Sequence, residues 1–455
     1  MTFDIILAID ENYGIGKNNF IPWRCPKDLQ IFKDKTQNSV IIVGRKTAQS
    51  LPYLFNRTVF CVSTSLSAYY SSNYKNNMSI FSTFEEALLK AKDTGFKIFV
   101  AGGAVLYDYV FSNHLDEIDV VHVSYIKGIH DCDTLLSDSS VNILKNFSIV
   151  SIDEYENFIH FEYRYTKYNE EQYLTLVRDV LKNGNRRESR NGTTISSFAK
   201  HLKFDLRHGF PLLTTKKMFL RGIIEELLFF IRGETDSKIL EDKNVNIWKG
   251  NTSREYLDSI GKTERREGVM GPMYGYQWRN FNALYDEETG NAIIPGIDQL
   301  SNVINLLKNN PTSRRIIMTT YNPDQVDDGV LPPCHSIVLQ FYCSDGFLDT
   351  FCYNRSSDIG LGLPFNIAST SLLILLIGKI TGLNPRYFDL SLGDAHIYEN
   401  HQNSLIEQIN RRQYTFPTIS LPDIRNLEDL DTLTAKDFVL NNYRSHPSLS
   451  MSMVA

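Results

Sequence analysis

Cys334 is the side chain in this sequence best suited to act as a nucleophile. It follows two prolines and precedes His335 in the stretch VLPPCHSIVLQFY, whose later residues alternate between apolar and polar as in a strand. A cysteine attacks as the thiolate, which needs positive charge or hydrogen-bond donors nearby. Cysteines without such surroundings are usually small buried residues, and Cys343 and Cys352 are interpreted in that way.

Several arginines could supply this charge and also bind a phosphate. They are Arg190, in a predicted turn, the adjacent Arg314 and Arg315, and Arg355, which precedes Ser356. A guanidinium group matches phosphate oxygens with two parallel hydrogen bonds, so arginines that converge with a serine would hold a phosphorylated substrate. Adjacent arginines are also common on solvated or salt-bridged surfaces.

Two further polar residues lie in apolar stretches. Glu226 belongs to IIEELLFF, a predicted buried helix, where desolvation would raise the pKa of the carboxyl and let it exchange protons. The alternative for Glu226 is a buried salt bridge. Asn366 follows Pro364 in LGLPFNIAS, and its amide can both donate to and accept from the edge of a pyrimidine.

A second group of candidate residues lies near the N-terminus. A glycine-rich loop leads through Trp23 into a predicted helix that has Pro26 in its first turn, followed by Asp28 and, one turn later, Phe32. A carboxylate at this position can simply favour the helix dipole. Between two aromatic side chains, however, it is suited to hold a flat, protonatable ring.

Two strand ends in the same region favour binding of a dinucleotide. Gly102 and Gly103 lie where a predicted strand gives way to a helix, which allows backbone N–H groups to approach a pyrophosphate. Arg45 and Lys46 lie at the end of another predicted strand. Each of these features is weak alone, and their order and spacing carry the interpretation.

The elements that must position these residues fall into two domains. Residues 1–167 alternate short β-rich runs with helical segments, which predicts an α/β domain with a central mixed sheet flanked by helices. A short junction at 168–171 leads into an α+β domain over 172–455, which opens on an amphipathic helix. The junction lacks Gly/Ser-rich or Pro-rich sequence, so we expect the domains to be closely coupled.

Composition excludes several classes of protein. The chain has 455 residues, 42% of them hydrophobic, and a formal charge of −6, which argues against a nucleic acid as its main partner. Its six cysteines form no C-x-x-C pair or zinc-like spacing, so we expect neither disulfides nor a metal. The apolar stretch SLLILLIGKI is about ten residues long and too short to span a bilayer, so we predict a buried helix and a cytoplasmic protein.

Residues 1–167 resemble dihydrofolate reductase. The family motif G-x-x-N-x-[IL]-P-W is present at 16–23, and G-R-x-T follows at 44–47. The resemblance implies that Asp28 holds the pterin and promotes its protonation before hydride transfer. It implies folate contacts at Phe32 and Arg57, and NADPH contacts at Ala8, Gly16, Arg45, Lys46, Thr47, Ser63, Thr64, Gly102 and Gly103. Ala48 and the sequence LFNR depart from the family pattern and affect cofactor and folate-tail packing.

Residues from about 170 to 455 are similar to thymidylate synthase. The motifs are P-C-H, E-L-L, G-P-x-Y-G-x-Q-W-R, L-G-x-P-F-N and G-D-A-H-I-Y. The similarity implies that Cys334 attacks C6 of dUMP, that Glu226 and Tyr274 move protons, and that 5,10-methylenetetrahydrofolate supplies the carbon. The implied dUMP contacts are Arg190, Arg314, Arg315, His335, Arg355, Ser356, Asn366, His396 and Tyr398, and the implied folate contacts are Trp248, Asn251, Asp358 and Gly362.

Three departures and two alternatives accompany this similarity. Asn354 replaces the usual Gln, the loop at Arg190 is a residue shorter, and Ser189 replaces an acid there. Together the resemblances imply a bifunctional dihydrofolate reductase–thymidylate synthase that acts as a homodimer, with Arg314 and Arg315 donated across subunits. The alternatives are a pyrimidine hydroxymethylase, against whose cytosine form Asn366 argues, and a reductase unit kept only as a scaffold. No membrane partner is expected.

Overall fold

The computed structural model describes residues 2–65, 78–189 and 192–452. Internal contacts divide the chain into two units, the first comprising Met1–Lys167 with Arg412–Thr415 and the second Tyr168–Arg411 with Phe416–Ala455. The sequence did not predict that residues 412–415 belong to the first unit. There the N–H of Ile149 donates to the Gln413 carbonyl, and the N–H of Thr415 donates to the Ile149 carbonyl, both at 3.0 Å.

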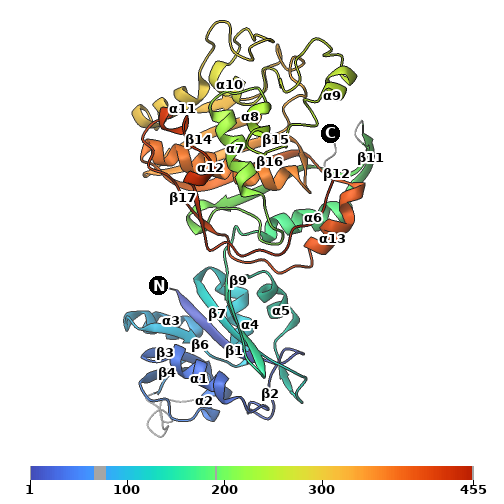
Figure 1. Cartoon of the computed structure of the whole chain (residues 1–455). Helices are drawn as coiled ribbons and strands as arrows, with labels where there is room; N and C mark the ends of the chain where they lie inside the picture. Colours follow the sequence, from blue (N-terminus) through green and yellow to red (C-terminus); the bar gives the residue numbers. More distant parts are fainter. Residues whose placement is uncertain (1, 66–77, 190–191, 453–455) are drawn as a thin grey trace. The chain divides into compact units, whose positions relative to one another are not determined.

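The first unit contains the predicted mixed sheet with flanking helices (Figure 1). Its strand order is β5-β4-β3-β6-β1-β7-β10-β9, parallel from β5 to β7 and antiparallel at β10 and β9. The central strands are buried on both faces, which explains their nearly continuous apolar sequences. The strands are β1 Phe3–Ile9, β3 Ser39–Gly44, β4 Arg57–Val62, β5 Met78–Phe81, β6 Lys97–Val100, β7 Ile118–Ile126, β9 Ser148–Glu154 and β10 Phe158–Arg164.

The helices of the first unit lie in the connections between its strands. α1 starts at Pro26, as the sequence predicted, and α4 follows the Gly102-Gly103 pair. The helices are α1 Pro26–Lys35, α2 Arg45–Ser50, α3 Phe84–Asp93, α4 Ala104–Asn113, α5 Asp138–Lys145 and the 3-10 turn η2 Leu115–Glu117. A small ribbon pairs β2 Gly14–Gly16 with β8 Thr134–Leu135.

The second unit is built on a six-stranded sheet in the order β11-β12-β16-β15-β14-β13. Neighbours are antiparallel except for β15 and β16, which run parallel. The strands are β11 Asn185–Ser189, β12 Gly192–Asp205, β13 Ile317–Thr319, β14 Val338–Ser344, β15 Phe347–Asp358 and β16 Asn384–Tyr398, with a separate ribbon of β17 Thr418–Ser420 and β18 Val439–Asn441. β13 begins at Ile317, after the exposed Arg314 and Arg315.

Helices pack against this sheet and around one another to form the main core of the second unit (Figure 1). The predicted amphipathic helix is α6, with Tyr173, Leu174 and Val177 buried. The helices are α6 Glu171–Asn183, α7 Leu220–Ile231, α8 Lys238–Glu241, α9 Arg254–Ser259, α10 Gly275–Asn280, α11 Gln299–Asn309, α12 Gly362–Thr381 and α13 Gln402–Gln408, with 3-10 turns η3 Leu206–His208, η4 Glu399–His401, η5 Glu428–Leu430 and η6 Ala435–Asp437.

α12 is longer than its apolar stretch suggested. The helix has 20 residues because it begins at Gly362 and runs through small and polar residues, among them Ser369 and Thr370, before the apolar stretch. Its length and composition would suffice to cross a bilayer, but most of the helix is buried within the protein. It packs against α7, α11, β15 and β16, as a core helix does.

Candidate active sites

Cys334 lies in the loop that leads into β14 and is fixed by β15. The backbone N–H groups of Arg355 and Ser356 donate to the Cys334 carbonyl at 2.9 and 3.2 Å. The Arg355 Nη2 donates to the Cys334 Sγ at 3.5 Å, and the Cys334 N–H donates to the Tyr274 hydroxyl oxygen at 3.0 Å. The Cys334 Sγ also lies 3.5 Å from the Pro332 carbonyl oxygen. A guanidinium group beside a thiol can stabilise the thiolate when the proton leaves. The structure therefore brings together three residues that the sequence separates widely.

Tyr274 and His335 stack beneath this loop. Their ring centroids are 4.5 Å apart, and Tyr274 also stacks with Phe230 at 5.0 Å. Burial raises the pKa of Tyr274 well above its usual value, so the phenol keeps its proton. Burial lowers the pKa of His335 to about 4, so this ring is neutral at physiological pH.

Glu226 projects from α7 and is 6% exposed. Its described hydrogen-bond partner is Trp248, whose indole N–H donates to Oε1 at 2.9 Å. Desolvation raises the pKa of Glu226 to about 7, although the Trp248 hydrogen bond opposes the shift. The neighbouring Glu225 pairs with Lys243 at 2.8 Å, so the buried salt bridge considered for Glu226 belongs to Glu225.

Candidate nucleotide contacts extend along β15 and β16. Arg355 and Ser356 lie on β15, and His396 lies on β16 in an edge-to-face contact with Tyr398 at 5.2 Å. Asn366 is half-buried in the first turns of α12. Arg190 is outside the described residues. The exposed Arg314 and Arg315 precede β13, and within the described part of the chain neither forms an ion pair with an acid.

Asp358, the last residue of β15, belongs to the group of predicted folate contacts. It accepts hydrogen bonds from the N–H groups of Gly360 at 2.8 Å and Leu361 at 3.3 Å. Burial opposes ionisation, but interactions led by the His401 hydrogen bond lower the pKa of Asp358 overall. Among the other predicted folate contacts, Gly362 is the first residue of α12 and lies next to Asp358. Trp248 and Asn251 are buried in a different segment of the second unit.

Supporting residues in the second unit escaped prediction. Asn354, seen in the sequence only as a departure, is buried and accepts a hydrogen bond from the Ser336 N–H at 2.9 Å, which fixes the loop after Cys334. The buried Lys216 ammonium donates to the Gly360 carbonyl beside Asp358. Desolvation lowers the pKa of Lys216 to about 8. The sequence signal that could have revealed Lys216 is a lysine within the mainly apolar stretch PLLTTKKMFL.

In the first unit, Asp28 lies in the first turn of α1, with Phe32 one turn later. Burial raises the pKa of Asp28, and a hydrogen bond from the Ser124 hydroxyl partly offsets this shift. Ser124 belongs to β7 and was not predicted, because its proximity to Asp28 depends on how the strand lies beside α1. The indole N–H of Trp23 is buried and has no hydrogen-bond partner among the described residues.

The candidate cofactor residues lie at the ends of neighbouring parallel strands. α2 begins at Arg45 after β3, Ser63 and Thr64 follow β4, and Gly102-Gly103 follow β6. Parallel strands end at the same edge, where dinucleotides bind in sheets of this kind. A Cβ atom at Gly102, where φ is +112°, would lie 3.2 Å from the Thr47 hydroxyl oxygen, so this approach favours glycine.

Other candidates occupy separate positions in the same unit. Lys46 is exposed on α2, Ala8 lies in β1 and Gly16 in β2. Arg57 begins β4, at the opposite edge from Ser63, and its guanidinium donates to the Thr36 hydroxyl at 3.2 Å. The structure therefore places the predicted folate-tail contact apart from the predicted cofactor contacts.

Comparison with known proteins identifies the class of both units. The thymidylate synthase family model matches residues 171–455, and the dihydrofolate reductase family model matches residues 2–170. The chain is 38% identical to a bifunctional dihydrofolate reductase-thymidylate synthase of Paramecium tetraurelia, over 99% of this chain and 98% of the relative. It is 34% identical to one from Zea mays (99% and 96%) and 35% identical to one from Plasmodium chabaudi (93% and 84%).

The chain belongs to the bifunctional dihydrofolate reductase-thymidylate synthase family. It is an enzyme with an oxidoreductase unit and a methyltransferase unit, as the sequence predicted. Neither the hydroxymethylase nor the scaffold alternative is favoured by these matches.

Proposed function

We propose that residues 172–455 convert dUMP to dTMP with 5,10-methylenetetrahydrofolate, and that residues 1–167 reduce the resulting dihydrofolate with NADPH in the cytoplasm. The observation that supports this most strongly is the fixed Cys334 thiol, 3.5 Å from the Arg355 guanidinium, together with a buried Glu226 whose pKa is raised to about 7. The first group supplies a nucleophile, and the second exchanges protons at neutral pH.

In the synthase unit the Cys334 thiolate adds to C6 of dUMP. The electron pair of the C5=C6 bond then moves to C5 as an enolate, which attacks the one-carbon unit. Asn366 holds the pyrimidine edge, and Arg355 and Ser356 bind the phosphate with Arg190. Glu226 can give or receive a proton because both of its forms are populated near pH 7. The neutral His335 and the protonated Tyr274 stack on each other beside Cys334.

In the reductase unit Asp28 is the acid that acts near the pterin. Its raised pKa favours the protonated carboxyl, which can give a proton to the nitrogen of a C=N bond. The protonated bond then accepts hydride at carbon. Arg45, Thr47, Ser63 and the Gly102-Gly103 pair would bind the phosphates of NADPH, which supplies the hydride. Phe32 and Arg57 would contact the pterin and the folate tail.

We also propose that the synthase unit forms a homodimer through the outer face of its sheet. This face exposes large apolar side chains from four strands, which is unusual for a free surface. The exposed fractions are 76% for Phe198, 50% for Ile317, 63% for Tyr342 and 39% for Phe351. Arg314 and Arg315 immediately precede β13 of the same sheet, in reach of a partner placed there.

Mixed dimers test this arrangement. A Cys334→Ser subunit should be inactive, and so should a subunit with both Arg314→Ala and Arg315→Ala. In a mixture of the two, a site can combine an intact Cys334 with Arg314 of the partner subunit and Arg315 of the partner subunit. Random pairing should restore synthase activity to about a quarter of the wild-type value. Failure of the mixture to regain activity would argue against donation across subunits.

A coupled assay tests both activities together. The protein is mixed with dUMP, 5,10-methylenetetrahydrofolate and NADPH, while absorbance follows folate conversion and NADPH consumption and mass spectrometry identifies the nucleotide. We expect dTMP and matched NADPH consumption. Cys334→Ser should stop dTMP formation but leave reduction of added dihydrofolate, and Asp28→Asn should do the reverse. A hydroxymethyl nucleotide, or dTMP without NADPH consumption, would contradict the proposal.

A further inference from the structure

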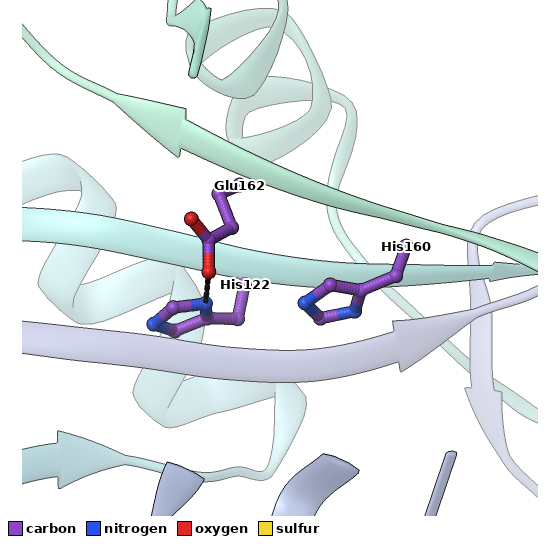
Figure 2. Close-up of side chains that lie close together, drawn as sticks. All are labelled: His122, His160 and Glu162. Carbon is purple, nitrogen blue, oxygen red and sulfur yellow. Dashed lines mark ion pairs between the residues drawn. The ribbon is translucent and has the colours of Figure 1, made fainter. Parts of the chain in front are cut away.

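Three side chains with metal-binding chemistry meet in the first unit, where β7 pairs with β10. His122 on β7 faces Glu162 on β10 as its cross-strand partner, and His160 lies two residues from Glu162 on the same strand. Figure 2 shows the two imidazole rings side by side, with the Glu162 carboxylate close to His122. One ligand atom from each residue lies within 4.8 Å of the other two. Both histidines are more than nine-tenths buried.

Each imidazole is held by one nitrogen, which leaves the other nitrogen directed at the cluster. The His122 Nε2 hydrogen-bonds the Asp4 carboxylate at 3.1 Å, and the His160 Nδ1 hydrogen-bonds the Ser124 hydroxyl oxygen at 3.1 Å. The opposite nitrogens, His122 Nδ1 and His160 Nε2, are buried and have no hydrogen-bond partner in the described part of the chain. The His122 Nδ1 lies 3.4 Å from the Glu162 Oε1.

The hydrogen bond at one nitrogen of each ring determines whether the other nitrogen carries a lone pair. Asp4 has a lowered pKa and can only accept, so the His122 Nε2 carries the hydrogen and Nδ1 has a lone pair when the ring is neutral. The Ser124 hydroxyl also hydrogen-bonds Asp28. When it donates to that carboxylate, the His160 Nδ1 donates to Ser124, which leaves a lone pair on Nε2. When His122 is neutral, two lone pairs and a carboxylate oxygen therefore face one space, an arrangement that suits a metal cation.

We propose that His122, His160 and Glu162 bind a divalent transition-metal ion such as Zn²⁺ or Co²⁺. Two imidazoles and one carboxylate are a common ligand set for these ions, with water as the fourth ligand. The Asp4–His122 hydrogen bond matches the carboxylate that typically supports a metal-bound histidine from behind. Metal bonds near 2 Å place tetrahedral ligands about 3.3 Å apart. The Glu162 side chain, 25% exposed, can move to close the difference.

Lys35 is the competitor for this space. Its ammonium pairs with the Glu162 Oε1 at 2.5 Å, whereas Lys97 pairs with Asp4 at 2.7 Å on the far side of His122. A metal ion must displace the Lys35 ammonium, which is 28% exposed and can turn to solvent. The proposal therefore predicts effects of opposite sign: loss of a ligand should weaken metal binding, and loss of the Lys35 charge should strengthen it.

Cobalt titration of the full chain tests the proposal. Co²⁺ is added to metal-free protein, and the visible absorption of tetrahedral Co²⁺ measures its binding. We expect one site per chain, at least tenfold weaker binding in His160→Gln and in Glu162→Gln, and tighter binding in Lys35→Met. His114→Gln is the matched control, since His114 also lies between two glutamates, Glu85 and Glu117, but outside the cluster. It should bind Co²⁺ as the wild type does.

The variants keep all six cysteines, so binding of Co²⁺ to thiolates would be unchanged among them. Circular dichroism checks that each variant is folded. The proposal is overturned if the wild-type chain binds no Co²⁺ below millimolar concentration, or if His160→Gln and Glu162→Gln bind as tightly as His114→Gln. It is equally overturned if Lys35→Met weakens binding, because removal of a competing cation cannot do so. None of these outcomes depends on either enzyme activity.

Discussion

Replacing Trp248 with Phe should raise the pH at which Glu226 titrates. The Trp248 indole N–H donates to the Glu226 Oε1 at 2.9 Å, and it favours the ionised carboxylate. Hydrogen bonds to charged groups contribute about 1.5–3 kcal/mol. Since 1.36 kcal/mol corresponds to one pKa unit, the loss should raise the pKa of Glu226 from about 7 by roughly one to two units. The phenyl ring would keep most of the packing against Phe230 and Tyr274.

The assay is the pH dependence of dTMP formation at saturating dUMP and folate. The change in rate with pH that is due to Glu226 is the one that is lost in Glu226→Gln. The pH at the midpoint of this change should be higher in Trp248→Phe than in the wild type. Trp278→Phe is the matched control, because the Trp278 indole N–H is buried without a hydrogen-bond partner among the described residues. An unchanged midpoint in Trp248→Phe, or an equal shift in Trp278→Phe, would refute the assigned cause.

Two further predictions concern Ser124 and Glu170. Ser124→Ala should raise the pKa of Asp28 and move the pH profile of dihydrofolate reduction upward, whereas Ser124→Thr, which keeps a hydroxyl, should not. Glu170 is 1% exposed and accepts hydrogen bonds from the N–H and hydroxyl groups of Thr214 and Thr215. Glu170→Gln turns an NH₂ group toward these donors and should destabilise the synthase unit by about 2–3 kcal/mol, seen as a lower unfolding temperature in calorimetry.

These two predictions have simple controls. Equal pH profiles for Ser124→Ala and Ser124→Thr would mean that the hydroxyl does not act on Asp28. For Glu170→Gln, the relevant calorimetric transition is the one that dUMP raises, because a ligand stabilises the unit that binds it. The neighbouring Glu171→Gln should change this transition by less than about 0.5 kcal/mol, since the Glu171 carboxylate is partly exposed and pairs with the exposed Arg178. Equal effects of the two variants would contradict the predicted role of Glu170.

Local sequence patterns were sufficient to predict most of the fold. The central strands of the first unit are nearly continuous apolar runs because both of their faces are buried, and α1 begins at its proline. The error at α12 has a local cause: the helix is longer than predicted because buried small and polar residues extend its apolar stretch. The contact of residues 412–415 with β9 had no local signal.

The candidate sites were less accessible to sequence because they depend on register and on distant contacts. The motif around Cys334 predicts a nucleophile, but its contacts with Tyr274 and Arg355 arise only when the loop meets α10 and β15. The pairing of His122 with Glu162 is a matter of strand register, and a shift of one residue would place them on opposite faces. No spacing rule within one segment can reveal such a pair.

The most direct measurement is covalent trapping of the thiol. The protein is incubated with 5-fluoro-dUMP and 5,10-methylenetetrahydrofolate, and intact-mass and peptide mass spectrometry locate the product. Fluorine at C5 cannot leave as a proton does, so the adduct formed by attack at C6 should persist. We predict one nucleotide and one folate bound through Cys334, and no adduct in Cys334→Ser. Absence of an adduct in the wild-type protein, or attachment at Cys343 instead, would contradict the account.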